Sequence, residues 1–222
     1  MTRLKKILNS PVLALGLTPL IFAISQIIIL GFYWLNKGYA GDFTITVSRY
    51  VGLELWSSIL FAICNLAIII IMFRYYLYLR PSRSKLWFIF GCLQVAGFSL
   101  LSIFPANAFM PSPVREVVVN IHEVSARVMF ASMLLMAAET LRFTFPNHLK
   151  FLQKLSLTKF PKNIIFLKTA TPACIAFIAL GCLYLSAFFF KSPLYENFVL
   201  IIETSYIYGF IAFLLLTQSK TE

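Results

Sequence analysis

The sequence predicts an all-α membrane protein, a bundle of six transmembrane helices joined by short loops. The composition is 60% hydrophobic and only 12% charged, which leaves too little polar surface for a water-soluble domain. The apolar residues fall in blocks of about 20, the length that crosses a hydrocarbon core about 30 Å thick. Runs such as 66–73 are apolar on every face, so the alternating strands of a membrane barrel do not fit.

Six apolar blocks define the predicted spans. They are residues 12–35, 53–76, 86–104, 117–141, 169–190 and 198–216. The basic residues before the first block are typical of a signal peptide, but the block is about twice as long as a signal peptide's apolar region. It also lacks a persuasive cleavage site, so we expect it to remain as a helix. The chain is therefore predicted to form a single membrane domain, 1–222.

Basic residues alternate along the connections, and this alternation predicts the orientation. The N-terminal segment and the second and fourth connections are rich in Lys and Arg, whereas the other connections carry Asp42, Glu116 and Glu196. Short loops rich in Lys and Arg stay on the cytoplasmic side, so both termini are predicted to be cytoplasmic. The same asymmetry explains the net charge of +11 without nucleic acid. We expect a bacterial inner membrane, or the plasma membrane or an endomembrane in a eukaryote.

The fourth connection has a pattern of its own. Leucines and phenylalanines are mixed with lysines between Pro146 and Pro161, which predicts an interfacial helix at about 148–158. This helix would place lysines against anionic lipid headgroups. The lysines concerned are Lys150, Lys154 and Lys159. The alternative, that they only determine the topology, remains open.

Cysteine and histidine give no metal-binding pattern. The two histidines, His122 and His148, are predicted on opposite sides of the membrane, and a zinc site needs more ligands than either side offers. The cysteines occur within spans without a C-x-x-C motif, and we interpret them as packing residues. They are Cys64, Cys92, Cys174 and Cys182. The sequence therefore predicts neither a metal nor another cofactor.

Ionisable residues inside the spans point to function, because an unpaired charge in hydrocarbon is costly. Those in the outer half of the bilayer are Glu54, His122, Glu123, Arg127 and Glu203. Arg127 lies about 15 Å from the start of its span, near the midplane, and Glu123, four residues earlier, is its expected partner. If their helices turn these groups inward, they form a polar pocket that opens to the outside.

A structural interpretation of the same residues remains open. Buried polar groups also hold transmembrane helices together, and Glu123, Arg127 and Glu203 would do so without binding a ligand. Glu139 and Arg142, near the cytoplasmic end of the fourth span, are expected to extend their side chains to the interface.

Several short motifs occur in order along the chain. They are Ser48, Gly52 and Glu54 before and at the start of the second span, Asn65 and Arg74 within it, Asn107 after the third, His122 in the fourth and Glu203 in the sixth. Together they resemble the DRAM-like family of six-span proteins (damage-regulated autophagy modulators), with its Sfk-type and GPI-anchor lipid-remodelling relatives and bacterial counterparts. The resemblance implies a non-catalytic protein linked to lipid distribution, lipid-anchor processing or membrane traffic.

Three functions remain under consideration. The first is lipid interaction, with the outer pocket holding a polar headgroup and membrane lipids as partners. The second is a proton-coupled transporter of a small solute, suggested by the same carboxylates and the imidazole. The third is an intramembrane hydrolase with His122 as general base, which lacks an evident nucleophile. No GxxxG face identifies a dimer, so the oligomeric state and any membrane-protein partner are open.

Overall fold

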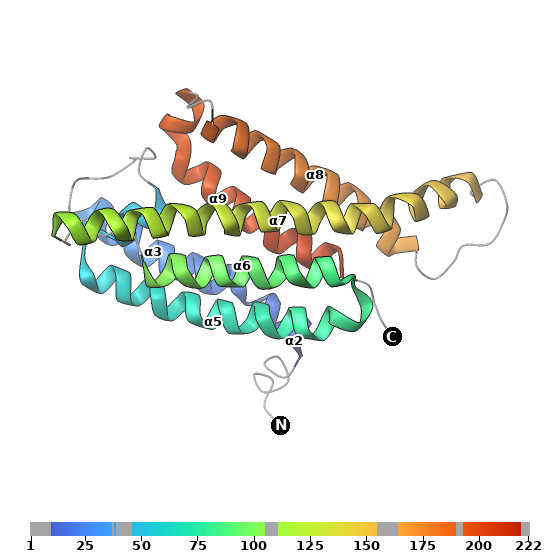
Figure 1. Ribbon diagram of the computed structural model, residues 1–222, viewed down its shortest axis with the longest axis horizontal. Coiled ribbons are helices and arrows are strands. Elements are labelled where there is room, and N and C mark those ends of the chain that lie inside the picture. Colours follow the sequence, from blue (N-terminus) through green and yellow to red (C-terminus); the bar gives the residue numbers. More distant parts are fainter. Residues whose placement is uncertain are drawn as a thin grey trace.

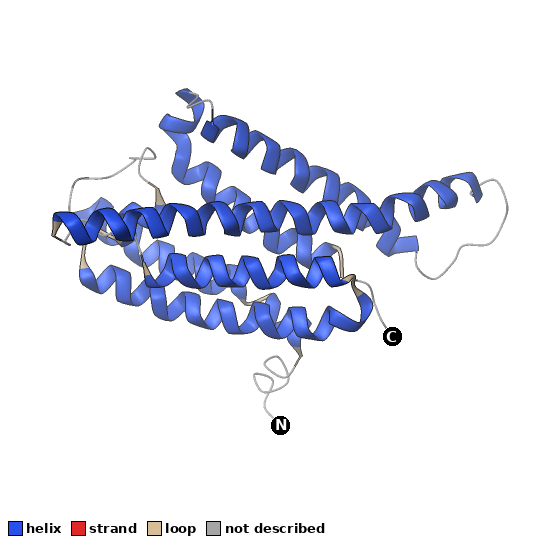
Figure 2. Ribbon diagram, viewed as in Figure 1, coloured by secondary structure: helices blue, strands red, loops and turns tan. Residues whose placement is uncertain are grey.

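The computed structural model describes residues 10–36, 38, 46–104, 111–154, 164–189 and 193–218. Side chains are described for 10–36, 38, 46–104, 111–145, 170–185 and 197–218. Within these ranges every regular element is a helix, as Figure 2 shows. The predicted all-α class is therefore confirmed for the described part of the chain.

The helices follow one another with short connections. They are α2 (Pro11–Leu15), α3 (Thr18–Asn36), α4 (Val47–Val51), α5 (Leu55–Leu79), the 3₁₀ turn η1 (Arg80–Ser82), α6 (Lys85–Ile103), α7 (Ser112–Lys154), α8 (Ile164–Phe189) and α9 (Pro193–Leu216). Local sequence explains the turn between α5 and α6. Pro81 cannot continue the α5 ladder, and the Ser84 hydroxyl caps α6 by accepting the Trp87 N–H at 3.1 Å.

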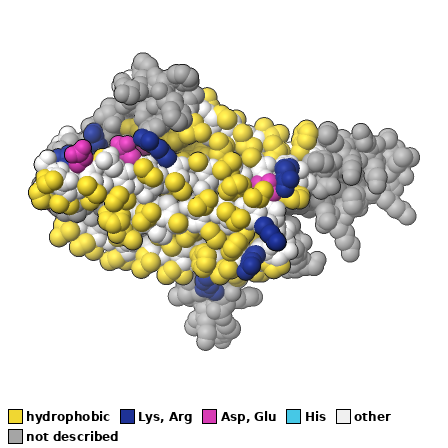
Figure 3. Space-filling view, viewed as in Figure 1, with side chains coloured by type: hydrophobic (Ala, Val, Ile, Leu, Met, Phe, Trp, Pro, Cys, Tyr) yellow, Lys and Arg dark blue, Asp and Glu magenta, His cyan; other side chains and the backbone are white. Residues whose placement is uncertain are grey.

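Five described segments are long and apolar enough to cross a membrane. They are Pro11–Asn36, Leu55–Ser82, Lys85–Ile103, Ser112–Phe145 and Asn197–Leu216. The remaining predicted block is occupied by α8, a helix of 26 residues whose described apolar segment, Ala170–Leu185, is shorter. Large apolar side chains also cover the exposed face in Figure 3, as lipid contact requires. The chain is therefore a helical protein of the membrane-embedded class.

Figure 1 shows α7 running the length of the molecule, with α5 and α6 along one side and α8 along the other. We call the end of the bundle at η1 the inner end and the end where α7 begins the outer end. At the inner end α8 lies close to α7, and toward the outer end α8 and the start of α9 diverge from it (Figure 1). On one side, α6 thus covers α7 over the length of α6 itself, and on the other side α8 covers α7 in part.

Helix α7 is longer than the predicted fourth span. It continues without interruption from Ser112 to Lys154, whereas the prediction ended the span at residue 141. The backbone of 148–154 is therefore the end of α7 and not a separate interfacial helix, and 155–158 lie outside the described residues. Pro146 does not break the helix, although an X-Pro pair disfavours helix at the preceding residue.

Candidate functional site

The outer polar residues are bonded to different neighbours. Glu54 is the N-cap residue of α5, and its carboxylate accepts a hydrogen bond from Trp56 Nε1 at 2.8 Å. His122 is buried on α7, with Nδ1 2.8 Å from the Phe104 carbonyl oxygen at the end of α6. The histidine thus joins α7 to the last carbonyls of its neighbour, which is a structural use of the ring.

Glu203 lies on α9 and is partly buried. Its carboxylate accepts a hydrogen bond from the backbone N–H of Val47, the first residue of α4. The next residue of α9 is Thr204, and its Oγ1 lies 3.4 Å from Gln26 Nε2 of α3. These contacts hold the short helix α4 and helix α3 against α9. They do not bring Glu203 into a common hydrogen-bonded site with His122.

Glu123 and Arg127 form the ion pair that their spacing predicts. Arg127 NH2 donates to Glu123 Oε2 at 3.1 Å. The predicted inward orientation is wrong for this pair, because the side chains of Arg127 and Glu123 are 61% and 55% exposed. The five outer residues therefore do not form one interior pocket, because Glu123 and Arg127 are exposed whereas His122 is buried.

Packing contacts locate Arg127 along the bundle. A Cβ placed on Gly97 of α6 would lie 2.9 Å from Ser125 O and 3.0 Å from Met129 N, so Arg127 is level with Gly97. Gly97 is twelve residues from Lys85 at the inner end of α6, which corresponds to about 18 Å. In a hydrocarbon core about 30 Å thick, that depth is close to the middle. The exposed ion pair thus begins near mid-depth and extends toward the outer end.

The motif residues of the family resemblance lie in several places. Ser48 Oγ is 3.0 Å from Thr46 Oγ1, and Gly52 is the C-cap residue of α4. Asn65 donates from Nδ2 to Ser102 Oγ at 2.9 Å, while its buried Oδ1 has no partner. Arg74 is exposed near the inner end of α5. Asn107 lies outside the described residues, as do Lys159 and the side chains of Lys150 and Lys154.

A polar cluster at the inner end was not predicted from the sequence. The Glu139 carboxylate is only 7% exposed and accepts hydrogen bonds from Ser84 Oγ at 2.6 Å and Arg142 NH2 at 2.8 Å. The expectation that Glu139 extends to the interface is therefore wrong. Arg142 is 63% exposed, as expected. One residue further along α7, Thr140 Oγ1 accepts from Trp87 Nε1 at 3.1 Å, which joins α6 and α7 again.

Two side chains hold the end of α9, one from α5 and one from the turn between α5 and α6. The Tyr75 hydroxyl donates to the Leu214 carbonyl at 2.9 Å, and the Arg83 guanidinium donates to the Thr217 carbonyl. Arg83 also lies over the Trp87 ring, at 5.4 Å from its centroid. Burial lowers the pKa of the Arg83 guanidinium, which still remains charged. The last carbonyls of a helix lack intrahelical donors, so these bonds stabilise the end of α9.

An open groove lies between α7 and α8 in the inner half of the bundle. It has a volume of about 370 Å³ and is lined by apolar side chains and one guanidinium. The lining residues are Ala138, Leu141, Arg142, Phe145, Ile175 and Ile178. Arg142 uses NH2 for Glu139, whereas a guanidinium has five N–H donors. The groove therefore combines an apolar trough with a cation that retains hydrogen-bonding capacity.

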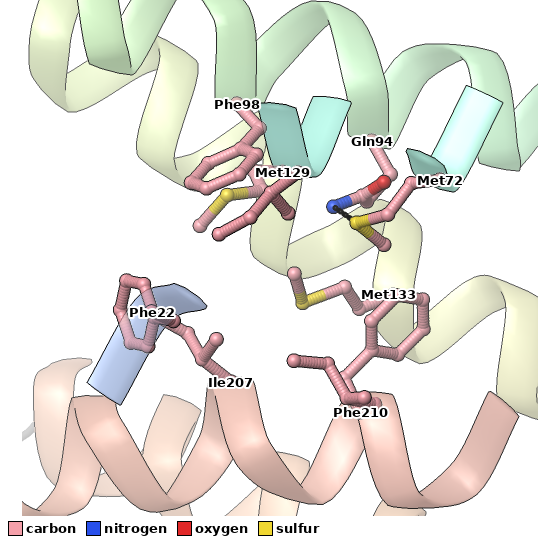
Figure 4. A pocket seen from close by; sticks show the side chains of 10 residues that line it. Phe22, Met72, Gln94, Phe98, Met129, Met133, Ile207 and Phe210 are labelled. Carbon is pink, nitrogen blue, oxygen red and sulfur yellow. Dashed lines mark hydrogen bonds between the residues drawn. The ribbon is translucent and has the colours of Figure 1, made fainter. Parts of the chain in front are cut away.

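A second cavity lies at the centre of the bundle (Figure 4). Its volume is about 20 Å³, enough for about one water molecule. Apolar side chains line it except for Gln94, whose Nε2 lies 4.0 Å from Met72 Sδ. Met129 and Met133 of α7 complete one side of it (Figure 4). The cavity has neither the size nor the polar lining of a solute-binding site.

The described residues contain no group of three or more His, Cys, Asp or Glu side chains placed to hold a metal ion. Comparisons of the chain with protein-family models, curated proteins and solved structures found no match. The resemblance to the DRAM-like family therefore stays a prediction. The fold and the apolar surface define the class, a helical membrane protein, and its function has to be argued from the geometry.

Proposed function

We propose that the chain is a non-catalytic integral membrane protein with six spans and cytoplasmic termini, and that it binds a phospholipid. The six-span topology is supported by the 26-residue length of α8. The orientation is supported by the basic residues, because most of the described ones lie toward the inner end (Figure 3). Loops rich in Lys and Arg remain cytoplasmic, so the inner end faces the cytoplasm.

The observation that carries the lipid proposal is the groove between α7 and α8. Its apolar walls, including Ile175 and Ile178, suit an acyl chain that lies along the helices. Arg142 at the inner end suits a phosphate, because the guanidinium offers donors in a planar fork. The cytoplasmic leaflet also carries the anionic lipids. The expected ligand is therefore an anionic phospholipid of the inner leaflet.

The lipid site is placed in the groove because the five outer residues are not joined into one pocket. The transporter alternative has less support, since the central cavity takes about one water molecule. Among the described residues, the hydrolase alternative has no nucleophile bonded to a base: His122 Nδ1 is bonded to Phe104 O, and the Ser125 hydroxyl donates to Ile121 O at 2.7 Å. A role in lipid distribution, lipid-anchor processing or membrane traffic agrees with lipid binding and rests on the family resemblance.

Native mass spectrometry of the purified chain tests the proposal. The protein is reconstituted with phosphatidylglycerol or phosphatidylcholine, and lipid adducts are counted for the wild type and two groove variants. Ile178→Trp fills the trough, and Arg142→Gln removes the cation while Ser84 still donates to Glu139. We expect phosphatidylglycerol adducts on the wild type and their loss from both variants.

Two control variants make the test specific. Arg80→Gln removes an equivalent exposed charge at the inner end, and Ile27→Trp enlarges a side chain that is 70% exposed on α3. Both should retain the phosphatidylglycerol adducts. Equal adducts for the two lipids, or unchanged adducts on both groove variants, would contradict the proposal.

A further inference from the structure

The Glu123–Arg127 pair lies on a face of α7 that is covered by α8 toward the inner end. One turn toward the inner end, the Phe130 ring contacts Tyr184, with ring centroids 4.8 Å apart. One further turn toward the inner end, Leu134 lies against Gly181 of α8. Residues spaced by three or four share a helix face, so Glu123 and Arg127 continue this row. They are exposed because α8 has diverged from α7 at their level (Figure 1).

This position is unfavourable for a chain surrounded by lipid alone. The pair begins near mid-depth, as its alignment with Gly97 shows, and both side chains are more than half exposed. Charged groups at such depth are rare on lipid-facing surfaces and normally face protein or water. The hydrogen bond from Arg127 NH2 to Glu123 Oε2 uses one donor of the guanidinium. The pair therefore requires a polar partner on the exposed side.

We propose that this face of α7 docks against the same face of a second copy of the chain, forming a twofold dimer within the membrane. The argument is charge complementarity. A twofold interface brings the same patch together from both subunits, so the patch must complement itself. Glu123 and Arg127 carry opposite charges one turn apart, so each Arg127 meets the Glu123 of the second copy. A partner of one charge would leave one of the two groups unmatched.

The geometry of the cross-dimer pairs follows from the pair within one chain. With the twofold axis along the membrane normal, equivalent residues lie at equal depth, and Glu123 is offset from Arg127 by about 6 Å along the helix. The intrachain pair already spans this offset at 3.1 Å. Exposed apolar residues flank the charges and supply packing: Val124, Val128 and Leu135 are 57%, 37% and 45% exposed. The interface thus combines a four-charge network with close apolar contact.

Two single charge reversals test the dimer. Glu123→Arg makes the patch positive, and Arg127→Glu makes it negative. We expect the wild type to have twice the protein mass of the monomer by light scattering in mild detergent. Each reversal alone should give a monomer. Co-expressed with different affinity tags, the two variants should purify together as a mixed dimer.

Further variants guard against a folding defect. The double variant Glu123→Arg with Arg127→Glu keeps an ion pair with its signs exchanged and should remain a dimer. Arg115→Glu reverses an exposed charge three turns away on the same helix and should also remain a dimer. A monomeric wild type, a dimer that both single reversals leave intact, or failure of the two folded variants to purify together would overturn the proposal. The proposal would also be overturned if the wild type were a monomer with a bound lipid and both reversals removed that lipid. The proposed lipid groove lies in the other half of α7, so neither result decides the other.

Discussion

Helix α7 packs against α6 on one side and against α8 on the other, and the two contacts differ. Against α6, contacts run the whole length of the shorter helix, from Ser84 and Trp87 at the inner end to Phe104 at the outer end. Against α8, the contacts of the described side chains lie in the inner and middle parts, and the outer part of α7 carries exposed charge. One side of α7 thus builds the core, and the other is available for lipid or a second chain.

The physical difference between the two sides lies in the atoms that meet. Gly97 of α6 lies against backbone atoms of α7, Ser125 O and Met129 N, and backbone cannot move without shifting the helix. Gly181 of α8 lies against the ends of side chains: Leu134 Cδ1 of α7, which can rotate, and Tyr206 Oη of α9. In membranes close backbone approach and interhelical hydrogen bonds replace the hydrophobic effect in holding helices together. The α6 side should therefore be the more sensitive to substitution.

The largest effect is expected from Gly97→Ala. The new methyl group would meet Ser125 O at 2.9 Å, so α6 and α7 must separate, at a cost of about 2 kcal/mol. The free energy of unfolding in a titration with sodium dodecyl sulfate, followed by circular dichroism, measures the change. Gly31→Ala on α3 is the control, because its Cβ meets nothing within 4 Å. Equal losses for the two variants would refute the close-packing argument.

Trp87→Phe is expected to have the next effect. It removes the hydrogen bond from Nε1 to Thr140 Oγ1 and leaves a small cavity, because Trp87 is 2% exposed. We expect the same titration to show a loss of about 1 to 2 kcal/mol. Trp56→Phe, near the outer surface, serves as the matched control and should cost less. The prediction fails if the Trp56 variant is the less stable of the two.

Gly181→Ala is the corresponding variant on the α8 side of α7. The methyl group would approach Leu134 Cδ1 of α7 at 2.9 Å, which can give way by rotation, and Tyr206 Oη of α9 at 3.0 Å. We expect a loss of at most about 1 kcal/mol, below that of Gly97→Ala. Thermal unfolding in one detergent compares the two variants directly. A greater loss at Gly181 would reverse the ranking of the two sides.

The smallest effect on the monomer is expected from Glu123→Gln with Arg127→Gln. An exposed pair four residues apart on a helix contributes about 0.3 to 0.5 kcal/mol. The unfolding free energy of the monomer in detergent should therefore change by no more than this amount. A loss above about 1 kcal/mol would show that the pair belongs to the folded core, in contrast to its exposure of 61% and 55%.

The sequence predicted helix positions better than side-chain orientations. The five described segments that are long enough to span a membrane overlap predicted blocks, because twenty successive apolar residues in a membrane form a helix whatever surrounds them. Helix α7 continues 13 residues beyond the predicted end of the fourth span at 141, since the basic residues that mark a membrane boundary do not stop a helix. The pair of Glu123 and Arg127 was predicted because its spacing is local. The exposure of this pair was not predicted, because it depends on the path of α8 relative to α7.

The polar cluster at the inner end, around Glu139, also could not be predicted from local sequence. The contacts of Glu139 with Ser84, and of Arg83 with Thr217, join residues that are 55 and 134 positions apart. No local pattern marks these partners, and a glutamate near a span end is equally compatible with burial and with exposure.

By itself the sequence indicated the helical membrane class, where most of the long apolar helices lie and in what order the charges follow along them. These properties follow from hydropathy, length and spacing, which each segment carries independently. Only the tertiary structure decided which face each charge occupies, which helix ends are capped by distant side chains and where α7 is left uncovered. A helix turns by about 100° per residue, so the direction of a side chain acquires meaning only when the neighbouring helices are in place.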